Sequence, residues 1–209
     1  MSTETGTVAT GRPIAERPYV PDITIADPAP LGLAAFALTT FVLSLANANV
    51  WLTAAGSAVA LALAYGGTVQ LLAGMWEFKR NNTFGATAFS SYGGFWLSFF
   101  FLVHILKVTD HNAIGAYLLG WTIFTAYMTV ASLRVTAAVA LVFALLTLTF
   151  MFLTIGELTH DASAALSGWT KVGGWLGIAT AAAAWYASFA GVVNSTFRRT
   201  LMPVYPLET

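Results

Sequence analysis

Six long apolar segments, separated by short polar stretches, dominate the hydrophobic pattern of the chain. Each is close to the roughly 20 residues that a helix needs to cross the hydrocarbon core of a bilayer. They cover residues 31–52, 56–78, 87–108, 113–133, 136–158 and 172–193. The apolar runs are continuous and do not alternate with a period of two, which favours helices over the strands of a barrel. The pattern therefore predicts an all-α membrane protein with six transmembrane helices.

The segments outside these spans are short and polar. Residues 1–26 contain Pro13, Pro18 and Pro21, and they lack the apolar stretch of a secretory signal peptide. We interpret them as an N-terminal arm that is disordered or loosely docked. The expected organisation is this arm, a six-helix transmembrane domain over residues 27–200, and a C-terminal tail over residues 201–209.

The distribution of basic residues predicts the orientation, because cytoplasmic loops carry an excess of Lys and Arg. A cytoplasmic N-terminus would place seven basic residues on the cytoplasmic side, namely Arg12, Arg17, Lys79, Arg80, Arg134, Arg198 and Arg199. The opposite side would hold only Lys107 and Lys171. We therefore expect a multi-pass protein of the cell (plasma or inner) membrane with both termini in the cytoplasm.

Composition and charge narrow the class of protein. Apolar residues make up 57% of the chain and charged residues 9%, against roughly 25% charged in a soluble domain. The mean hydropathy is +0.74, so a large apolar surface must face lipid. A net charge of zero argues against a nucleic-acid partner, which would require a basic face. The absence of Cys excludes disulfides, thiolate nucleophiles and cysteine metal sites.

The predicted spans contain uncharged polar groups but no Asp, Glu, Lys or Arg near their centres. Motifs such as HExxH, GxSxG or a Walker-type phosphate loop are also missing, so we expect no enzyme, metal or cofactor. The polar candidates for lining a solute path are Thr39, Asn47, Gln70, Ser91 and Asn194. The alternative is that such groups only join helices to one another. Three Gly-Gly pairs favour close helix packing over local unwinding beside a cavity.

A helix-start signal opens the first span. Asp27-Pro28-Ala29-Pro30-Leu31-Gly32-Leu33 places proline in a first helical turn, where its missing N–H costs nothing. Two further stretches accompany it. The first covers Tyr65-Gly66-Gly67, Gln70, Gly74, Glu77, Asn82-Thr83-Phe84-Gly85, Thr87-Ala88-Phe89, Ser91-Tyr92-Gly93 and Phe95-Trp96. The second, near the C-terminus, contains Asn194, Phe197, Arg199-Thr200 and Pro203. With these motifs, the chain resembles the acetate uptake transporter family, or succinate–acetate permeases, over about residues 27–203.

The resemblance implies a six-helix protomer within a hexamer, each protomer having its own central path for acetate and, in some members, succinate, often with coupling to protons. It places a hydrophobic constriction at Phe36, Tyr92 and Leu146, and a position that affects solute size at Ala184. The family motif falls on Asp27, Pro28, Pro30 and Gly32. Its usual first residue is Asn, so Asp27 adds a charge near the predicted cytoplasmic mouth.

The residue types fit a small carboxylate substrate. Apolar rings can contact a methyl group, while the Tyr92 hydroxyl and Gln70 can donate to carboxylate oxygens. Desolvating an anion at an apolar constriction is costly, so we expect passage of the acid or of the anion with a proton. Two alternatives remain open, a channel for another small solute such as ammonia and a membrane scaffold or signalling protein with no solute path.

Overall fold

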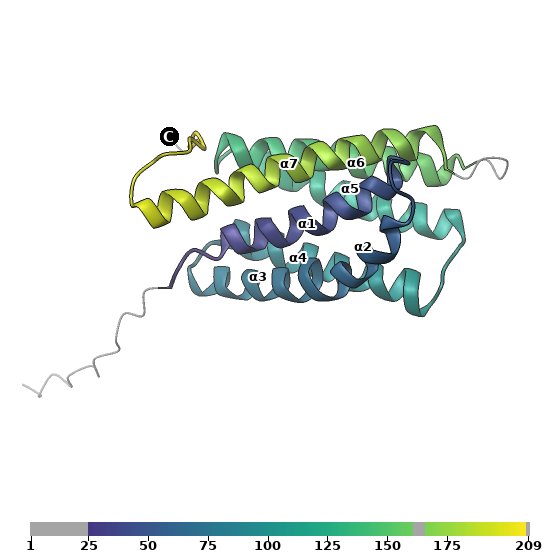
Figure 1. Ribbon diagram of the computed structural model, residues 1–209, viewed down its shortest axis with the longest axis horizontal. Helices are drawn as coiled ribbons and strands as arrows, with labels where there is room; N and C mark the ends of the chain where they lie inside the picture. Colours follow the sequence, from purple (N-terminus) through teal and green to yellow (C-terminus); the bar gives the residue numbers. More distant parts are fainter. Residues whose placement is uncertain (1–24, 161–165, 208–209) are drawn as a thin grey trace, which may run out of the picture.

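The computed structural model describes residues 25–160 and 166–207 (Figure 1). Nearly all of the expected N-terminal arm lies outside these residues. The helices are α1 (Ala29–Asn47), α2 (Ala54–Leu63), α3 (Gln70–Lys79), α4 (Thr83–Phe100), α5 (His111–Ser132), α6 (Ala137–Leu158) and α7 (Gly168–Phe197). A π-helical segment η1 (Ala64–Val69) joins α2 to α3, and a second, η2 (Phe101–Ile105), extends α4. Six continuous helical stretches are long and apolar enough to cross a membrane, which confirms the predicted fold class.

Side-chain caps explain where several helices begin. The Asp110 carboxylate accepts a hydrogen bond from the Ala113 amide at 2.7 Å, and the Asn82 side chain accepts from the Gly85 amide at 3.1 Å. Such caps satisfy amides that have no partner inside their own helix. Thr136 and Ser167 act in the same way at the starts of α6 and α7.

The boundaries differ from the prediction at the first and last spans. The first span was expected to reach residue 52, but α1 ends at Asn47. The chain turns back there, with Asn49 at φ 61° and the amides of Val50 and Trp51 both donating to the Leu45 carbonyl. Apolar residues continue through this turn, so hydropathy alone does not reveal it. Conversely, α7 has 30 residues and extends beyond the predicted span at both ends.

The first Gly-Gly pair lies both at a close helix contact and in a locally irregular stretch of helix. Gly66 and Gly67 lie within η1, where the helix widens into a π turn. A Cβ atom added at Gly66 would lie 2.6 Å from the Thr39 hydroxyl, and one at Gly67 would lie 2.7 Å from the Leu97 side chain. The pair therefore brings a locally irregular helix into close contact with α1 and α4. The other two pairs lie in regular helix, at residues 93–94 and 173–174.

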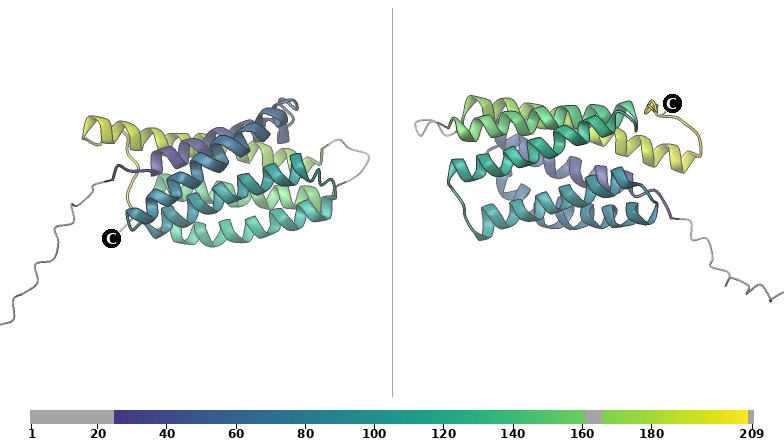
Figure 2. Two further views of the ribbon diagram at one scale, coloured as in Figure 1. Left: turned by 90° about the horizontal axis from the view of Figure 1, so that it is seen from below. Right: turned by 180° about the vertical axis from the view of Figure 1, so that it is seen from behind.

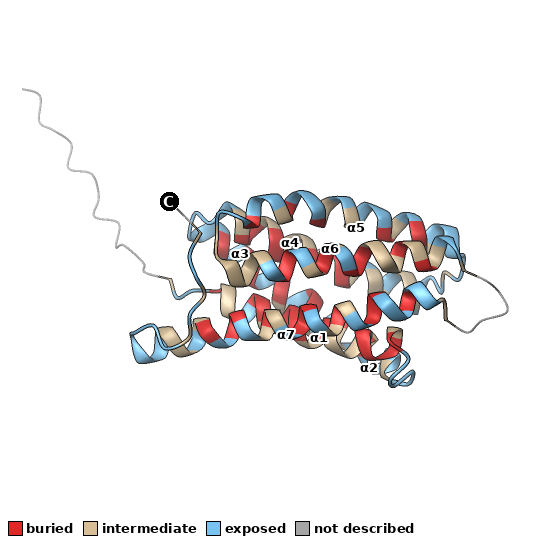
Figure 3. Cartoon of the chain, turned by 90° about the horizontal axis from the view of Figure 1, so that it is seen from above, coloured by how far each residue is buried: buried red, intermediate tan, exposed pale blue. Residues whose placement is uncertain are grey.

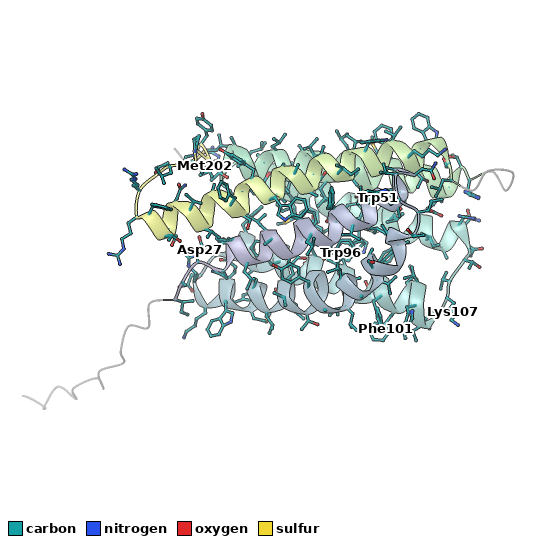
Figure 4. All side chains as sticks on the ribbon, in the orientation of Figure 1. Asp27, Trp51, Trp96, Phe101, Lys107 and Met202 are labelled. Atoms are coloured by element: carbon teal, nitrogen blue, oxygen red, sulfur yellow. The ribbon has the colours of Figure 1, made fainter. Side chains whose placement is uncertain are left out.

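The helices form one bundle in which α1 packs along α7, α7 along α6, α6 along α5, and α3 along α4. The views in Figures 1 and 2 show α1 between the α7 side and the α3–α4 side of the bundle. The start of α1 and the C-terminal tail lie at the same end of the molecule, near Asp27 and Met202, whereas Trp51 and Lys107 lie at the opposite end (Figure 4). We call these the termini end and the far end.

The outer surface of the bundle is apolar, unlike that of a soluble protein, and the mostly apolar interior also contains polar residues. The outward faces carry large apolar side chains, such as Ile123 and Val130, which are 61% and 69% exposed. The interior holds polar residues, among them Thr39, Gln70 and Glu77, with at most 1% exposure. Figure 3 shows the buried positions on the faces that the helices turn toward one another. This arrangement is the one expected where the surrounding medium is lipid.

Threonine pairs join neighbouring helices inside the bundle. The hydroxyls of Thr129 and Thr147 are 2.8 Å apart between α5 and α6, and each also lies within hydrogen-bonding distance of the carbonyl four residues earlier in its helix. Because each hydroxyl has one proton, one of the two donates across to the other helix and the other donates to its own carbonyl. Thr149 and Thr180 form a similar contact of 3.2 Å between α6 and α7. For these threonines, the interpretation as interhelical contacts agrees with the structure.

The C-terminal tail is tied to the termini end by backbone hydrogen bonds. The Ala137 amide donates to the Tyr205 carbonyl at 2.8 Å, and the Leu207 amide donates to the Val135 carbonyl at 3.1 Å. The Asn194 side chain accepts from two tail amides and donates to the Met202 carbonyl at 2.8 Å. The tail therefore lies across the start of α6.

Candidate solute path

Three cavities follow one another along the bundle. Cavity A, of about 120 Å³, reaches the far end and has Asn47 and Glu157 in its wall. Cavity B, of about 20 Å³, lies next to Gln70. Cavity C, of about 290 Å³, lies at the termini end beside Asp27 and Arg80. A and B share two wall residues and B and C share Leu33, so the three are neighbours in a row along the bundle.

Helical periodicity builds the wall of cavity A. Helix α1 contributes Phe36, Thr40, Leu43, Ser44 and Asn47, and α6 contributes Leu146, Thr149, Phe150, Leu153 and Glu157. Both sets are spaced by three or four residues, so each occupies one face of its helix. The walls are mostly aromatic and aliphatic, with hydroxyl and amide groups between them. Among the residues that the structure describes, Glu157 is the one charged residue in this wall.

The three residues expected at the constriction lie together between cavities A and B. Phe36 and Leu146 belong to the walls of both cavities, and Tyr92 belongs to the wall of cavity B. The rings of Phe36 and Tyr92 are 5.8 Å apart and tilted by 50°. All three side chains are at most 5% exposed. Cavity B between them is barely larger than the roughly 10–15 Å³ that one water molecule requires.

The Tyr92 hydroxyl does not point freely into this row. It lies 2.9 Å from the Thr125 hydroxyl, and Thr125 in turn donates to the Trp121 carbonyl at 2.7 Å. Either hydroxyl can be the donor in this contact; where Thr125 donates to the Trp121 carbonyl, its single proton is used and Tyr92 donates to Thr125. The Tyr92 hydroxyl thus has a partner inside the bundle and its ring lies beside Phe36, while donation of this hydroxyl to a solute stays a prediction.

Several polar atoms in these walls have no hydrogen-bond partner within the described part of the protein. They are the Gln70 Oε1 atom beside cavity B, and the Thr40 hydroxyl and Trp96 Nε1 atoms of residues that line cavity A. Leaving a buried polar atom unpaired costs about 1–3 kcal/mol. These atoms could form hydrogen bonds with a polar solute that entered the row after a small side-chain movement.

Of the remaining residues predicted from the sequence, some line a cavity and others do not. Asn47 lines cavity A and Asn194 lines cavity C while it also holds the tail. Thr39 donates to the Ala35 carbonyl at 2.9 Å and packs on η1, and neither Thr39 nor Ser91 lines cavities A to C. Ala184 is fully buried in the apolar core that also contains the constriction residues.

The opening motif forms part of cavity C. Asp27 accepts from the Ala29 amide at 3.1 Å and forms an ion pair with Arg80, which ties the start of α1 to the end of α3. The Pro30 carbonyl accepts from Ser188 at 2.6 Å, and Gly32 lies against the Phe89 ring, where a Cβ atom would come within 2.6 Å. Pro28 is the N-cap of α1, with φ −81°.

The sequence interpretation missed Glu77, Trp96 and Glu157 as candidates. Glu77 is fully buried; its Oε2 atom accepts from Asn82 at 2.9 Å, whereas its Oε1 atom has no partner in the described chain. Trp96 and Glu157 both belong to cavity A. A usable signal existed for Glu157, which lies eleven residues after Leu146 and therefore on the same face of α6.

Comparison with known proteins gives consistent matches. The model of the GPR1/FUN34/yaaH family matches residues 10–209. A solved structure described as the bacterial acetate channel SatP superposes with a TM-score of 0.79 at 35% identity, covering 87% of this chain and 99% of that chain. The succinate-acetate/proton symporter SatP of Escherichia coli strain K12 is 38% identical over 185 residues, which cover 86% of this chain and 95% of that protein.

Two fungal proteins are more similar in sequence but longer. Acetate permease A of Emericella nidulans is 45% identical over 195 residues, or 86% of this chain and 65% of that protein. Ammonia transport outward protein 2 of Saccharomyces cerevisiae is 43% identical over 192 residues, or 87% of this chain and 66% of that protein. The chain thus spans about two thirds of the length of these fungal relatives.

Proposed function

The chain belongs to the GPR1/FUN34/yaaH family of multi-pass membrane proteins, and we propose that it carries acetate and related short carboxylates through its own six-helix bundle. The observation that carries this proposal is the row of cavities A, B and C, narrowed at Phe36, Tyr92 and Leu146. The bacterial acetate channel and the named acetate permease support the choice of solute.

The chemistry of the row suits a solute with one apolar and one polar end. The aromatic and aliphatic walls can contact a methyl group, while Gln70 and Asn47 offer amide groups to oxygens. The constriction carries no charge to replace the hydration shell of an anion, and desolvating a carboxylate there is costly. We therefore propose that the solute crosses the constriction as the protonated acid, which links net transport to protons.

We propose that the termini end faces the cytoplasm of the cell membrane. Arg80, Arg134, Arg198 and Arg199 lie at or near that end of the helices, whereas Lys107 and Lys171 lie toward the far end. We also propose that protomers assemble as a hexamer in which each keeps its own path. Native mass spectrometry of the protein in detergent would test the subunit number.

A second candidate solute is ammonia, because one fungal relative is named for its transport. Like acetic acid, ammonia is small and uncharged in one protonation state, and an apolar constriction would pass it more readily than an ion. Loss of acetate uptake with retained ammonia flux in the same vesicles would favour this candidate.

Uptake into liposomes tests the proposal. The purified protein is reconstituted, ¹⁴C-acetate uptake is measured with and without an inward proton gradient, and succinate and lactate serve as competitors. We expect protein-dependent uptake that an acid exterior stimulates. Replacing Phe36 or Tyr92 by Ala should change solute selectivity, whereas Phe189→Ala on the outer surface, which is 54% exposed, should not. Wild-type protein without acetate uptake would contradict the proposal.

A further inference from the structure

A carboxylate lies at the far end of cavity A. Glu157, at the end of α6, is the one charged residue among the described residues that form the wall of this cavity. Its Oε2 atom lies 2.7 Å from the Nδ1 atom of His111, the first residue of α5. The two side chains are 21% and 46% exposed, so both remain in contact with the medium at the far end.

A second histidine extends this pair. The ring of His160 stacks on the ring of His111, with centroids 3.8 Å apart and an angle of 16° between the planes. Asp110, next to His111, has its carboxylate bonded to the Ala113 amide at the start of α5. On α7, Lys171 follows Thr170, which also lines cavity A, and Lys107 precedes α5. Tyr117, which lines cavity A, and His104, in η2, are further titratable groups of the described chain toward this end.

The position of Glu157 matters because the walls of cavity A have a low dielectric constant and focus the field of a charge. The repulsion between this carboxylate and an approaching solute is proportional to the charge of the solute. A dianion is therefore repelled about twice as strongly as a monoanion, and a neutral acid is not repelled at all. Protonation of His111 would offset the charge of Glu157, and histidine is the side chain that most readily changes charge between about pH 5 and pH 8.

We propose that Glu157, with His111 as its proton-dependent partner, is a charge filter at the mouth of cavity A that favours monocarboxylates over dicarboxylates. This inference rests on the proposed transport function and adds its specificity: the filter acts on the anions that enter cavity A, before they take up a proton to cross the constriction. The filter discriminates against dianions, and its contact with His111 makes the discrimination sensitive to the charge that His111 carries.

A purely structural role predicts different behaviour. If the contact only fastened the start of α5 to the end of α6, removing the charge would lower thermal stability and leave the preference among solutes unchanged. The ratio of succinate to acetate uptake separates the two roles, because the amount of folded protein cancels in a ratio.

The experiment measures ¹⁴C-succinate and ¹⁴C-acetate uptake at pH 6 and pH 8 in liposomes with the far end exposed to the assay medium. The variants are Glu157→Gln, Glu157→Asp and His111→Asn, and each ratio is divided by the wild-type ratio at the same pH, so that all variants are compared on the same mixture of solute protonation states. Asp110→Asn is the matched control, because it removes a carboxylate at the same end while Asn still caps α5.

Glu157→Gln should raise the succinate-to-acetate ratio at pH 8 by about fivefold or more. The repulsion that it removes is about twice as large for the succinate dianion as for the acetate monoanion. Glu157→Asp and Asp110→Asn should stay within about twofold of the wild type. His111→Asn should keep the succinate-to-acetate ratio at pH 6 below that of the wild type. If Glu157→Gln does not fold, this variant alone tests the proposal. Unchanged ratios in both variants would overturn the filter, whereas absence of wild-type acetate uptake would overturn the transport function itself.

Discussion

Replacing Tyr92 by Phe separates the role of the ring from that of the hydroxyl. The substitution keeps the ring next to Phe36 and removes the hydroxyl that lies 2.9 Å from the Thr125 hydroxyl. Thr125 keeps its own bond to the Trp121 carbonyl, so no buried donor is left without an acceptor. We expect a loss of about 0.5–1.5 kcal/mol in the free energy of unfolding, the net value of one buried hydrogen bond. Acetate uptake should stay within about twofold of the wild type.

The partner variant Thr125→Val should cost more, about 1–3 kcal/mol, because it leaves the Tyr92 hydroxyl buried without an acceptor. The double variant should lose less than the sum of the two single losses, since that hydroxyl is then absent. Unfolding in SDS-containing mixed micelles measures the stabilities, with exposed Tyr127→Phe as the control. A tenfold fall in acetate uptake by Tyr92→Phe at unchanged stability would refute the reasoning, because it would place the hydroxyl on the solute.

Three further expectations concern packing, passage and the tail. Gly174→Ala should destabilise the protein by about 1–3 kcal/mol in the same micelle assay, because its Cβ would lie 2.2 Å from the Ala48 amide nitrogen, whereas Gly94→Ala has nothing within 4 Å and should be neutral or nearly so. Leu146→Ala should widen the passage between cavities A and B, raise lactate uptake relative to acetate, and cost about 2–5 kcal/mol of stability. Asn194→Ala removes the side-chain bonds to the tail, so limited proteolysis should release the last residues faster than in the wild type.

The membrane fold could be predicted because hydropathy reports directly on it. Each of the six apolar runs contains a helix of the expected type, since a backbone in lipid must satisfy its own hydrogen bonds. The end of α1 could not be predicted in the same way. Trp51 and Leu52 are apolar but 64% and 55% exposed in a turn, and a hydropathy window cannot distinguish such residues from those inside a helix.

The site was only partly accessible from the sequence. Phe36, Tyr92 and Leu146 were placed by family resemblance, and the structure brings them together. The contact between Tyr92 and Thr125 joins residues 33 positions apart, so no local pattern reveals it. Glu157 lies at the end of a predicted span, and a count of charges along the chain does not show which face of a helix its side chain occupies.

The most direct test uses the absence of cysteine from the natural sequence. Leu43, in the wall of cavity A, is replaced by Cys, and Phe189, exposed on the outer surface, serves as the control position. Both variants are treated in liposomes with a small anionic methanethiosulfonate, and ¹⁴C-acetate uptake is then measured. If acetate passes through the bundle, modification of Leu43→Cys should block uptake, excess acetate should slow the modification, and Phe189→Cys should be unaffected. Full uptake by a fully modified Leu43→Cys protein would contradict a path through cavity A.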